Sequence, residues 1–150
     1  MRSLIGPLDI EWVIDDDNKL WFTQARPIFF PKAKLPVVAS GQALLTGAGI
    51  GASQSVAGQV WKLSSPKEMD RSMRGGILVV DDTSPVWEEC LPHFSALVTD
   101  HGCRTSHAAI IARETGIPAV VGTVKATELL TNGTRIVVRV ENGHGYVHLN

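Results

Sequence analysis

The chain has 150 residues, 44% hydrophobic and 19% charged, which suits one ordinary folded domain, or a small domain and part of another. Its 14 basic and 15 acidic residues leave a net charge of −1, which disfavours general binding to nucleic acid, and no apolar run approaches the roughly 18 residues that span a bilayer. With two cysteines and no secretory signal at its start, the chain is expected to be a soluble, cytoplasmic α/β protein with no nucleic-acid or membrane partner.

Residues 9–31 are expected to form a β-hairpin. Polar and apolar residues alternate from Asp9 to Ile14, an acidic turn follows at residues 15–18, and a second strand-like run extends from Leu20 to Arg26. A lone hairpin is marginally stable in water, so it needs a surface to lie on. A surface β-hairpin with no functional role is one interpretation of this segment.

Short strands and helices alternate in the pattern that follows this hairpin. The expected strands are residues 43–50, 59–63, 76–80, 95–100, 119–122, 135–140 and 146–149, with a loop of small residues at 51–58. The expected helices are residues 66–73, 84–91, 105–115 and 125–130. Ser65 is a candidate N-cap, and Asn142-Gly143 a hairpin turn. This order predicts a compact α/β domain with a mixed sheet.

The residues from Val98 to Pro118 are expected to carry the chemistry. They run strand, loop and helix, the order of an anion-binding turn. Gly102 allows a tight loop, while Thr105 or Ser106 is expected to cap free backbone amides. His107 then falls at about the first or second helical position, beside the positive end of the helix dipole.

This position favours a nucleophilic role for His107. The positive helix end disfavours imidazolium, and a histidine with an unperturbed pKa of about 6.5 is mostly neutral at pH 7. A phosphoryl group on the ring would bring negative charge to waiting amides and hydroxyls. A histidine that merely caps or packs is the alternative. A polar cluster at the start of the apolar helix 108–112 favours the functional interpretation.

The residues from Thr105 to Arg113, followed by Gly116 to Gly122, resemble the phosphohistidine signature of the phosphoenolpyruvate-utilising enzymes. The resemblance takes in residues 49–53, 83–85 and 96–100, so it covers most of residues 43–149. Cys103 departs from the pattern, because the family usually has the second glycine of a pair there. If that position needs a positive φ, a non-glycine residue would carry strain.

The resemblance implies a swivelling β/β/α phosphohistidine domain at residues 43–150, joined by a linker at 32–42 to the C-terminal hairpin of an ATP-grasp domain at 1–31. His107 would accept a phosphoryl group from ATP and pass it to pyruvate. The phosphate contacts implied are Gly102, Thr105, Ser106 and Arg113. Arg113 lies about two turns along the helix, so a structural role for it is the alternative.

The resemblance also implies roles for three hairpin residues. Glu11 and Gln24 would help to hold Mg²⁺ and the nucleotide, and Arg26 would face the nucleotide phosphates. Carboxylate and amide oxygens are hard ligands suited to Mg²⁺, and arginine complements phosphate.

The expected function is therefore that of a fragment of a phosphoenolpyruvate synthase-like dikinase. Its partners would be the body of the ATP-grasp domain and a phosphoenolpyruvate/pyruvate-binding (β/α)₈ barrel of a longer enzyme. The chain has no room for either, so it should not complete a reaction cycle alone. An enzyme like rifampin phosphotransferase or pyruvate phosphate dikinase, and a stand-alone phosphohistidine carrier domain, are the alternatives.

Overall fold

The computed structural model describes residues 8–27 and 42–150. Contacts divide the chain into two units, one within residues 1–36 and the other within residues 37–150. The predicted linker at 32–42 lies outside the described residues, apart from its last position. In the described ranges, no helix is long and apolar enough to cross a membrane.

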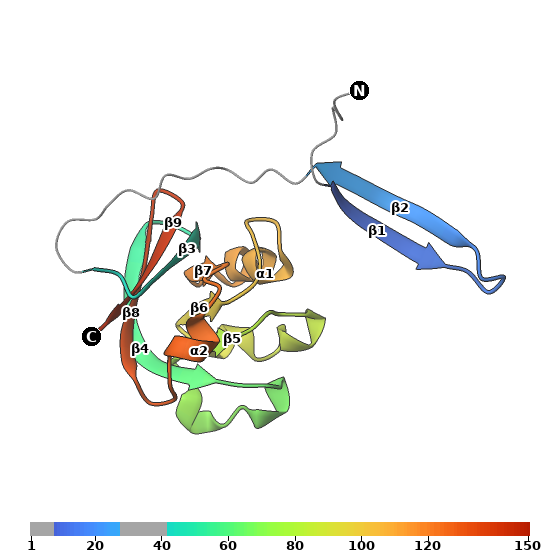
Figure 1. Ribbon diagram of the computed structural model, residues 1–150. Coiled ribbons are helices and arrows are strands. Elements are labelled where there is room, and N and C mark those ends of the chain that lie inside the picture. The colour runs from blue at the N-terminus through green and yellow to red at the C-terminus, as the bar shows by residue number, and fades with distance from the viewer. Residues whose placement is uncertain (1–7, 28–41) are drawn as a thin grey trace. The chain divides into compact units, whose positions relative to one another are not determined.

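The smaller unit is the predicted β-hairpin, in which β1 (Leu8–Ile14) pairs with β2 (Leu20–Pro27) in antiparallel fashion (Figure 1). Asp15 closes its turn, since its carboxylate accepts hydrogen bonds from the Trp21 indole at 2.6 Å and from the Lys19 amide at 2.9 Å. These bonds, the indole's foremost, hold the pKa of Asp15 below its ordinary value.

A β-bulge in this hairpin decides which side chains share a face. Trp12 pairs with Phe22, but Glu11 pairs with Gln24, so Thr23 is the extra residue. Because successive side chains of a strand alternate between faces, the bulge keeps apolar residues opposite one another on both sides of it. One face therefore collects Ile10, Trp12, Ile14, Leu20 and Phe22. The other face brings Glu11 beside Gln24.

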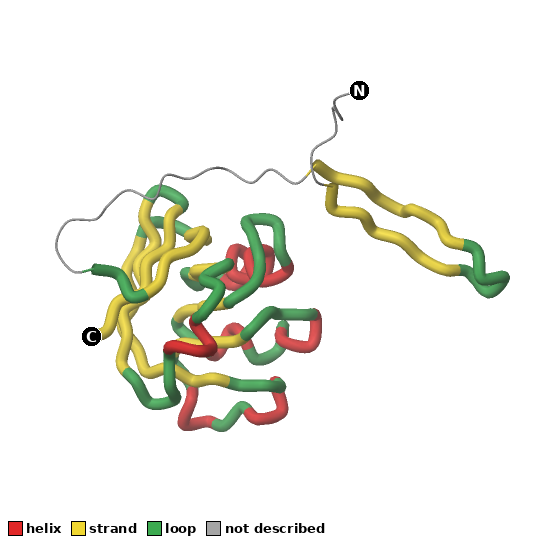
Figure 2. The backbone as a smooth tube through the Cα atoms, viewed as in Figure 1, coloured by secondary structure: helices red, strands yellow, loops and turns green. Residues whose placement is uncertain are grey.

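The larger unit is a closed barrel with strand order β3-β7-β6-β5-β4-β8-β9 (Figures 1 and 2). The strands are β3 (Leu45–Ile50), β4 (Gln54–Lys62), β5 (Ile77–Val80), β6 (Ala96–Thr99), β7 (Ala119–Val121), β8 (Arg135–Glu141) and β9 (His144–Leu149). β4 to β7 are parallel neighbours and the other pairs are antiparallel, which confirms the predicted mixed sheet. Pairing of β3 with β9 closes the sheet.

β5 and β6 are buried on both faces, as their continuous apolar runs predict. Leu78 and Val80 belong to the core cluster that includes helix α1 (His107–Thr115). Ile77 and Val79 belong to a second cluster with residues of β8 and β9. β5 thus packs against a hydrophobic cluster on each of its two faces.

The start of β4 is the main error among the predicted strands. Residues 54–58 are not part of a loop, because β4 begins at Gln54 and pairs with β8 along this stretch. Small residues here serve close packing. A Cβ atom added at Gly58 would lie 3.0 Å from the Ile77 side chain.

Two of the predicted helices are pairs of short 3₁₀ turns. These are η1 (Pro66–Glu68) and η2 (Arg71–Met73), then η3 (Pro85–Trp87) and η4 (Leu91–His93). Ser65 caps η1 as expected, but Asp70 accepts from the Ser72 amide and caps a new turn, which divides the first segment. The last predicted helix is the short α2 (Ala126–Leu129).

Candidate functional site

Helix α1 begins at His107, with Ser106 as its N-cap residue, and ends before Gly116, whose φ is 73°. His107 is therefore the first helical residue, two positions later than the predicted helix start. The next turn of the helix packs into the core through Ala108, Ala109, Ile111 and Ala112. Burial of this face holds the histidine backbone in place.

Both ring nitrogens of His107 have an oxygen partner. Nδ1 lies 3.2 Å from Oγ1 of Thr83, and Nε2 lies 3.4 Å from Oε1 of Glu88. Thr83 is 7% exposed, whereas the side chains of Glu88 and His107 are 56% and 25% exposed. Nε2 is therefore the ring nitrogen on the accessible side, and Nδ1 faces the buried threonine.

The segment after β5 supplies both partners of the ring. Asp82 accepts a hydrogen bond from the Thr83 amide at 2.7 Å, and Trp87, 6% exposed, anchors η3 immediately before Glu88. β5 and β6 are parallel neighbours, so the loops that follow them meet at the same edge of the sheet. Glu88 was not among the predicted site residues, although two consecutive apolar strands followed by polar residues could have pointed to this edge.

Gly102 makes the turn with positive φ in the loop before α1. Its φ is 115°, and an added Cβ atom would lie 2.9 Å from the Ser106 hydroxyl. Cys103 is not among the residues with positive φ, so the condition under which a non-glycine residue would carry strain there is not met. Gly102 makes the left-handed turn of this loop instead.

The cap expected from Thr105 or Ser106 is not formed by either hydroxyl. The Ser106 hydroxyl donates to the Cys103 carbonyl at 2.8 Å and makes no cap to a helix amide. The Thr105 hydroxyl lies 3.3 Å from the Cys103 sulfur. Both hydroxyls are used within the loop, because the backbone turns back on itself just before the helix.

Arg113 contacts this same loop. Its guanidinium donates to the Arg104 carbonyl at 2.6 Å, and Arg104 in turn donates to the Gly143 carbonyl at 2.6 Å. These bonds connect helix α1, the loop before it and the β8–β9 turn. They match the structural role weighed for Arg113, and its contact with phosphate stays a prediction.

In the hairpin, Glu11 and Gln24 are cross-strand partners, and both are exposed. A carboxylate and an amide oxygen on one face are a donor set that fits Mg²⁺, with room for water and phosphate oxygens. The backbone of Arg26 pairs with Asp9, but the Arg26 side chain lies outside the described part of the chain. Across the described ranges, no group of three or more His, Cys, Asp or Glu side chains could hold a metal.

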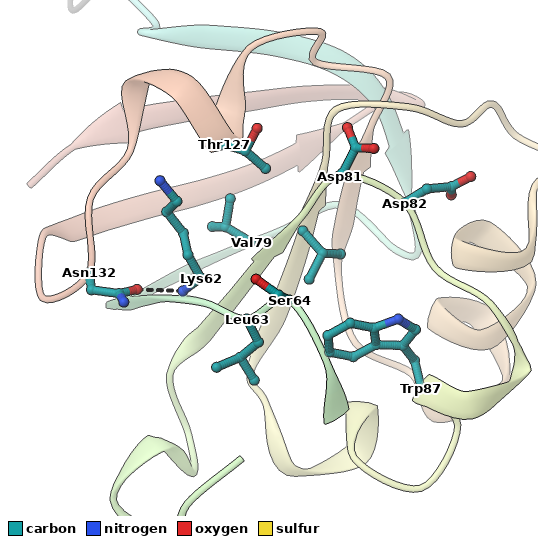
Figure 3. Close-up of a pocket in the computed structure, with 10 residues that line it drawn as sticks. Lys62, Leu63, Ser64, Val79, Asp81, Asp82, Trp87, Thr127 and Asn132 are labelled. Carbon is teal, nitrogen blue, oxygen red and sulfur yellow. Dashed lines mark hydrogen bonds between the residues drawn. The ribbon is translucent and has the colours of Figure 1, made fainter. Parts of the chain in front are cut away.

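A polar pocket of about 590 Å³ lies beside the segment that holds the ring. Its lining includes Lys62, Asp81, Asp82, Thr127 and Asn132, and Figure 3 shows the two aspartates at its edge. These aspartates directly precede Thr83, but His107 does not line the pocket.

The class of protein follows from a family comparison. Residues 73–143 match the family described as "PEP-utilising enzyme, mobile domain", and this range contains Thr83, Glu88 and His107. This part of the chain belongs to that family, which confirms the resemblance seen in the His107 segment.

Curated relatives that match most of this chain carry the name phosphoenolpyruvate synthase. The chain is 43% identical over 145 residues to phosphoenolpyruvate synthase of Pseudomonas aeruginosa (strain UCBPP-PA14), covering 91% of this chain and 18% of that protein. It is 43% identical over 150 residues to phosphoenolpyruvate synthase of Deinococcus radiodurans, covering 95% and 19%. The chain thus spans about a fifth of the length of these curated relatives. A solution structure of Enzyme I (nEIt) aligns with 51% of this chain and 31% of its own, at 32% identity and a TM-score of 0.45.

Proposed function

We propose that this chain is part of a phosphoenolpyruvate synthase-like dikinase, in which His107 accepts a phosphoryl group from ATP and passes it to pyruvate. The observation that carries the proposal is the His107 ring at the first position of α1, with Nε2 on the accessible side. The relatives named phosphoenolpyruvate synthase favour this assignment over an enzyme like rifampin phosphotransferase or pyruvate phosphate dikinase.

The contacts of the ring suggest how His107 would react. When the Thr83 oxygen accepts a hydrogen bond from Nδ1–H, the lone pair of the neutral ring lies on Nε2. This lone pair attacks phosphorus, the N–P bond forms, and the P–O bond of the donor breaks with its electrons on the departing phosphate oxygen. The start of α1 stabilises the negative charge of the bound group by about 0.3–1 kcal/mol.

The hairpin would contribute to the nucleotide site. Glu11 and Gln24 would hold Mg²⁺ from one face of β1 and β2, and Arg26 would face the nucleotide phosphates. Bound Mg²⁺ neutralises phosphate charge and orients the transferring group. The remaining ligands would come from the body of the ATP-grasp domain.

The proposed division of the chain is an ATP-grasp hairpin at residues 1–31, a linker at 32–42 and a mobile phosphohistidine domain at 43–150. A tether of this kind would let the domain visit an ATP site and then a pyruvate-binding barrel, the two partners proposed here. Gly102, Thr105 and Ser106 would lie on the phosphate side of the ring, and the reaction would take place in the cytoplasm.

Phosphorylation tests this proposal directly. When the chain is supplied with the missing domains, Mg²⁺ and ATP radiolabelled in its phosphates, we expect label on His107, because its Nε2 is the accessible nucleophile. The label should be acid-labile and base-stable, and peptide mass spectrometry should place it on His107.

Two variants complete this experiment. His107→Asn should abolish labelling, whereas His101→Asn, which alters an exposed histidine of the same loop, should retain it. Label in the His107→Asn chain, or label on another residue of the wild-type chain, would overturn the assignment.

A further inference from the structure

Glu88 contacts the ring nitrogen of His107 that the proposed reaction uses. The Glu88 carboxylate is 3.4 Å from Nε2, the same nitrogen that the proposed function requires to be unprotonated for attack. An ionised carboxylate accepts hydrogen bonds but cannot donate them. A hydrogen bond between an ionised Glu88 and the ring therefore requires a proton on Nε2, and the carboxylate occupies the side from which a phosphoryl group would arrive.

The segments that flank the ring in sequence carry other charged groups. They are Asp81, Asp82, Glu89, His101, Arg104 and Arg113. Asp81 pairs with His101 at 2.9 Å, Asp82 accepts from the Thr83 amide, and both arginines donate to backbone carbonyls. Within residues 42–150, Glu88 is the one carboxylate in contact with the ring.

We propose that Glu88 takes the Nε2 proton of His107 when the phosphoryl group is loaded, and returns it when the group leaves. This inference rests on the proposed phosphoryl transfer and adds a residue to it. Glu88 suits the role because its side chain is more than half exposed, so the carboxylate has room to turn as the donor arrives.

The step balances in protons and electrons. In the proposed step the ring reacts from its imidazolium form, in which Nδ1–H would donate to Thr83 and Nε2–H would donate to Glu88. The Nε2 proton moves to the carboxylate, and the freed lone pair forms the N–P bond while the P–O bond to the leaving phosphate breaks. Nδ1 keeps its proton. Glu88 is now a neutral acid that can donate a hydrogen bond to a phosphoryl oxygen, whereas a carboxylate would repel it.

The same geometry predicts that Glu88 slows phosphorylation of His107 in alkaline solution. A neutral ring that keeps its single proton on Nε2 has its lone pair on Nδ1, which faces buried Thr83. An ionised Glu88 holds the ring in that unreactive form and repels an incoming phosphate. Glu88 should therefore speed loading in acid and slow it in alkali.

Glu88→Gln and the matched control Glu89→Gln test this pH dependence. The 150-residue chain is treated with phosphoramidate, a small-molecule phosphoryl donor, and phosphorylation of His107 is followed by peptide mass spectrometry. The ratio of the Glu88→Gln rate to the wild-type rate cancels the donor's own pH dependence. We expect this ratio to rise from about one tenth near pH 6 to above one near pH 8.5. The Glu89→Gln ratio should stay near one, and a flat Glu88→Gln ratio would overturn the proposal.

Imidazole ¹⁵N chemical shifts give a readout that needs no phosphoryl transfer. In alkaline solution we expect the neutral His107 ring to carry its proton on Nε2 in the wild type and in Glu89→Gln. In Glu88→Gln the proton should move toward Nδ1, because the glutamine amide can donate to Nε2. An unchanged tautomer in Glu88→Gln would refute the role of Glu88. A changed tautomer without enzymatic labelling of His107 would instead count against the proposed function.

Discussion

Gly102 and Cys103 are adjacent in the loop that leads to His107, but only Gly102 has a positive φ. Gly102 has a φ of 115°, in a region that L-residues rarely adopt, and Ser106 leaves little space for a side chain there. Cys103 is not among the residues with positive φ, and it is exposed. The loop thus needs one glycine, and the departure from the family pattern at Cys103 costs no backbone strain.

Stability measurements can separate these two positions. Gly102→Ala should lower the free energy of unfolding by about 1–2 kcal/mol, because it places a Cβ atom in a left-handed conformation. Cys103→Gly should lower it by about 0.4–1 kcal/mol, because glycine gives the unfolded chain more conformational freedom. Urea unfolding of both variants checks these values. A more stable Cys103→Gly chain would show that the native residue is strained after all.

At the scale of a secondary-structure element, a single side chain, that of Asp15, bridges the turn of the β1–β2 hairpin. Asp15 accepts from both Trp21 and Lys19, so its carboxylate bridges the turn and the start of β2. The lowered pKa of Asp15 means that its stabilising contribution is present above the ordinary value near 3.8 and is lost as pH falls through the lowered one.

Acid titration of the whole chain tests this bridge. We expect the indole N–H resonance of Trp21 to move toward that of a solvent-exposed indole as pH falls from about 4 to about 2, since protonation weakens the acceptor. Trp12, for which the structure shows no bond to Asp15, is the internal reference. In Asp15→Asn the Trp21 resonance should lose this pH dependence. A Trp21 resonance that stays constant in acid would contradict the bridge.

At the scale of the whole molecule, the closed barrel contains its own core. Both clusters of buried apolar residues lie between Leu45 and Val147, within the larger unit. Closure also pairs the strand edges that an open sheet would expose. The hairpin, in contrast, has large exposed apolar side chains, including Trp12 and Phe22.

A chain of residues 42–150 should therefore fold without the hairpin. We expect its melting temperature to lie within about 2 °C of the corresponding transition in the full chain, because both hydrophobic clusters are retained. Its amide NMR spectrum should overlay that of the same residues in the 150-residue chain. A shorter chain that is unfolded, or that melts far earlier, would show that the barrel depends on residues before 42.

Local sequence signals determined much of this protein. Alternating residues predicted the first hairpin, Asn142-Gly143 predicted the last turn, and Gly116 predicted the end of α1, because each signal acts over a few neighbouring residues. The same signals placed His107 at a helix start. Proline and small residues misled the predictions at β4 and the 3₁₀ turns, where distant packing partners decide the conformation.

Tertiary structure alone decided the closure of the barrel and the surroundings of the ring. Thr83 and Glu88 precede His107 by 24 and 19 residues, and they meet it because parallel β5 and β6 deliver their following loops to one edge of the sheet. No local pattern encodes such a meeting, since it depends on which strands pair. The sequence alone indicated His107, whereas strand order determined which residues contact its two ring nitrogens.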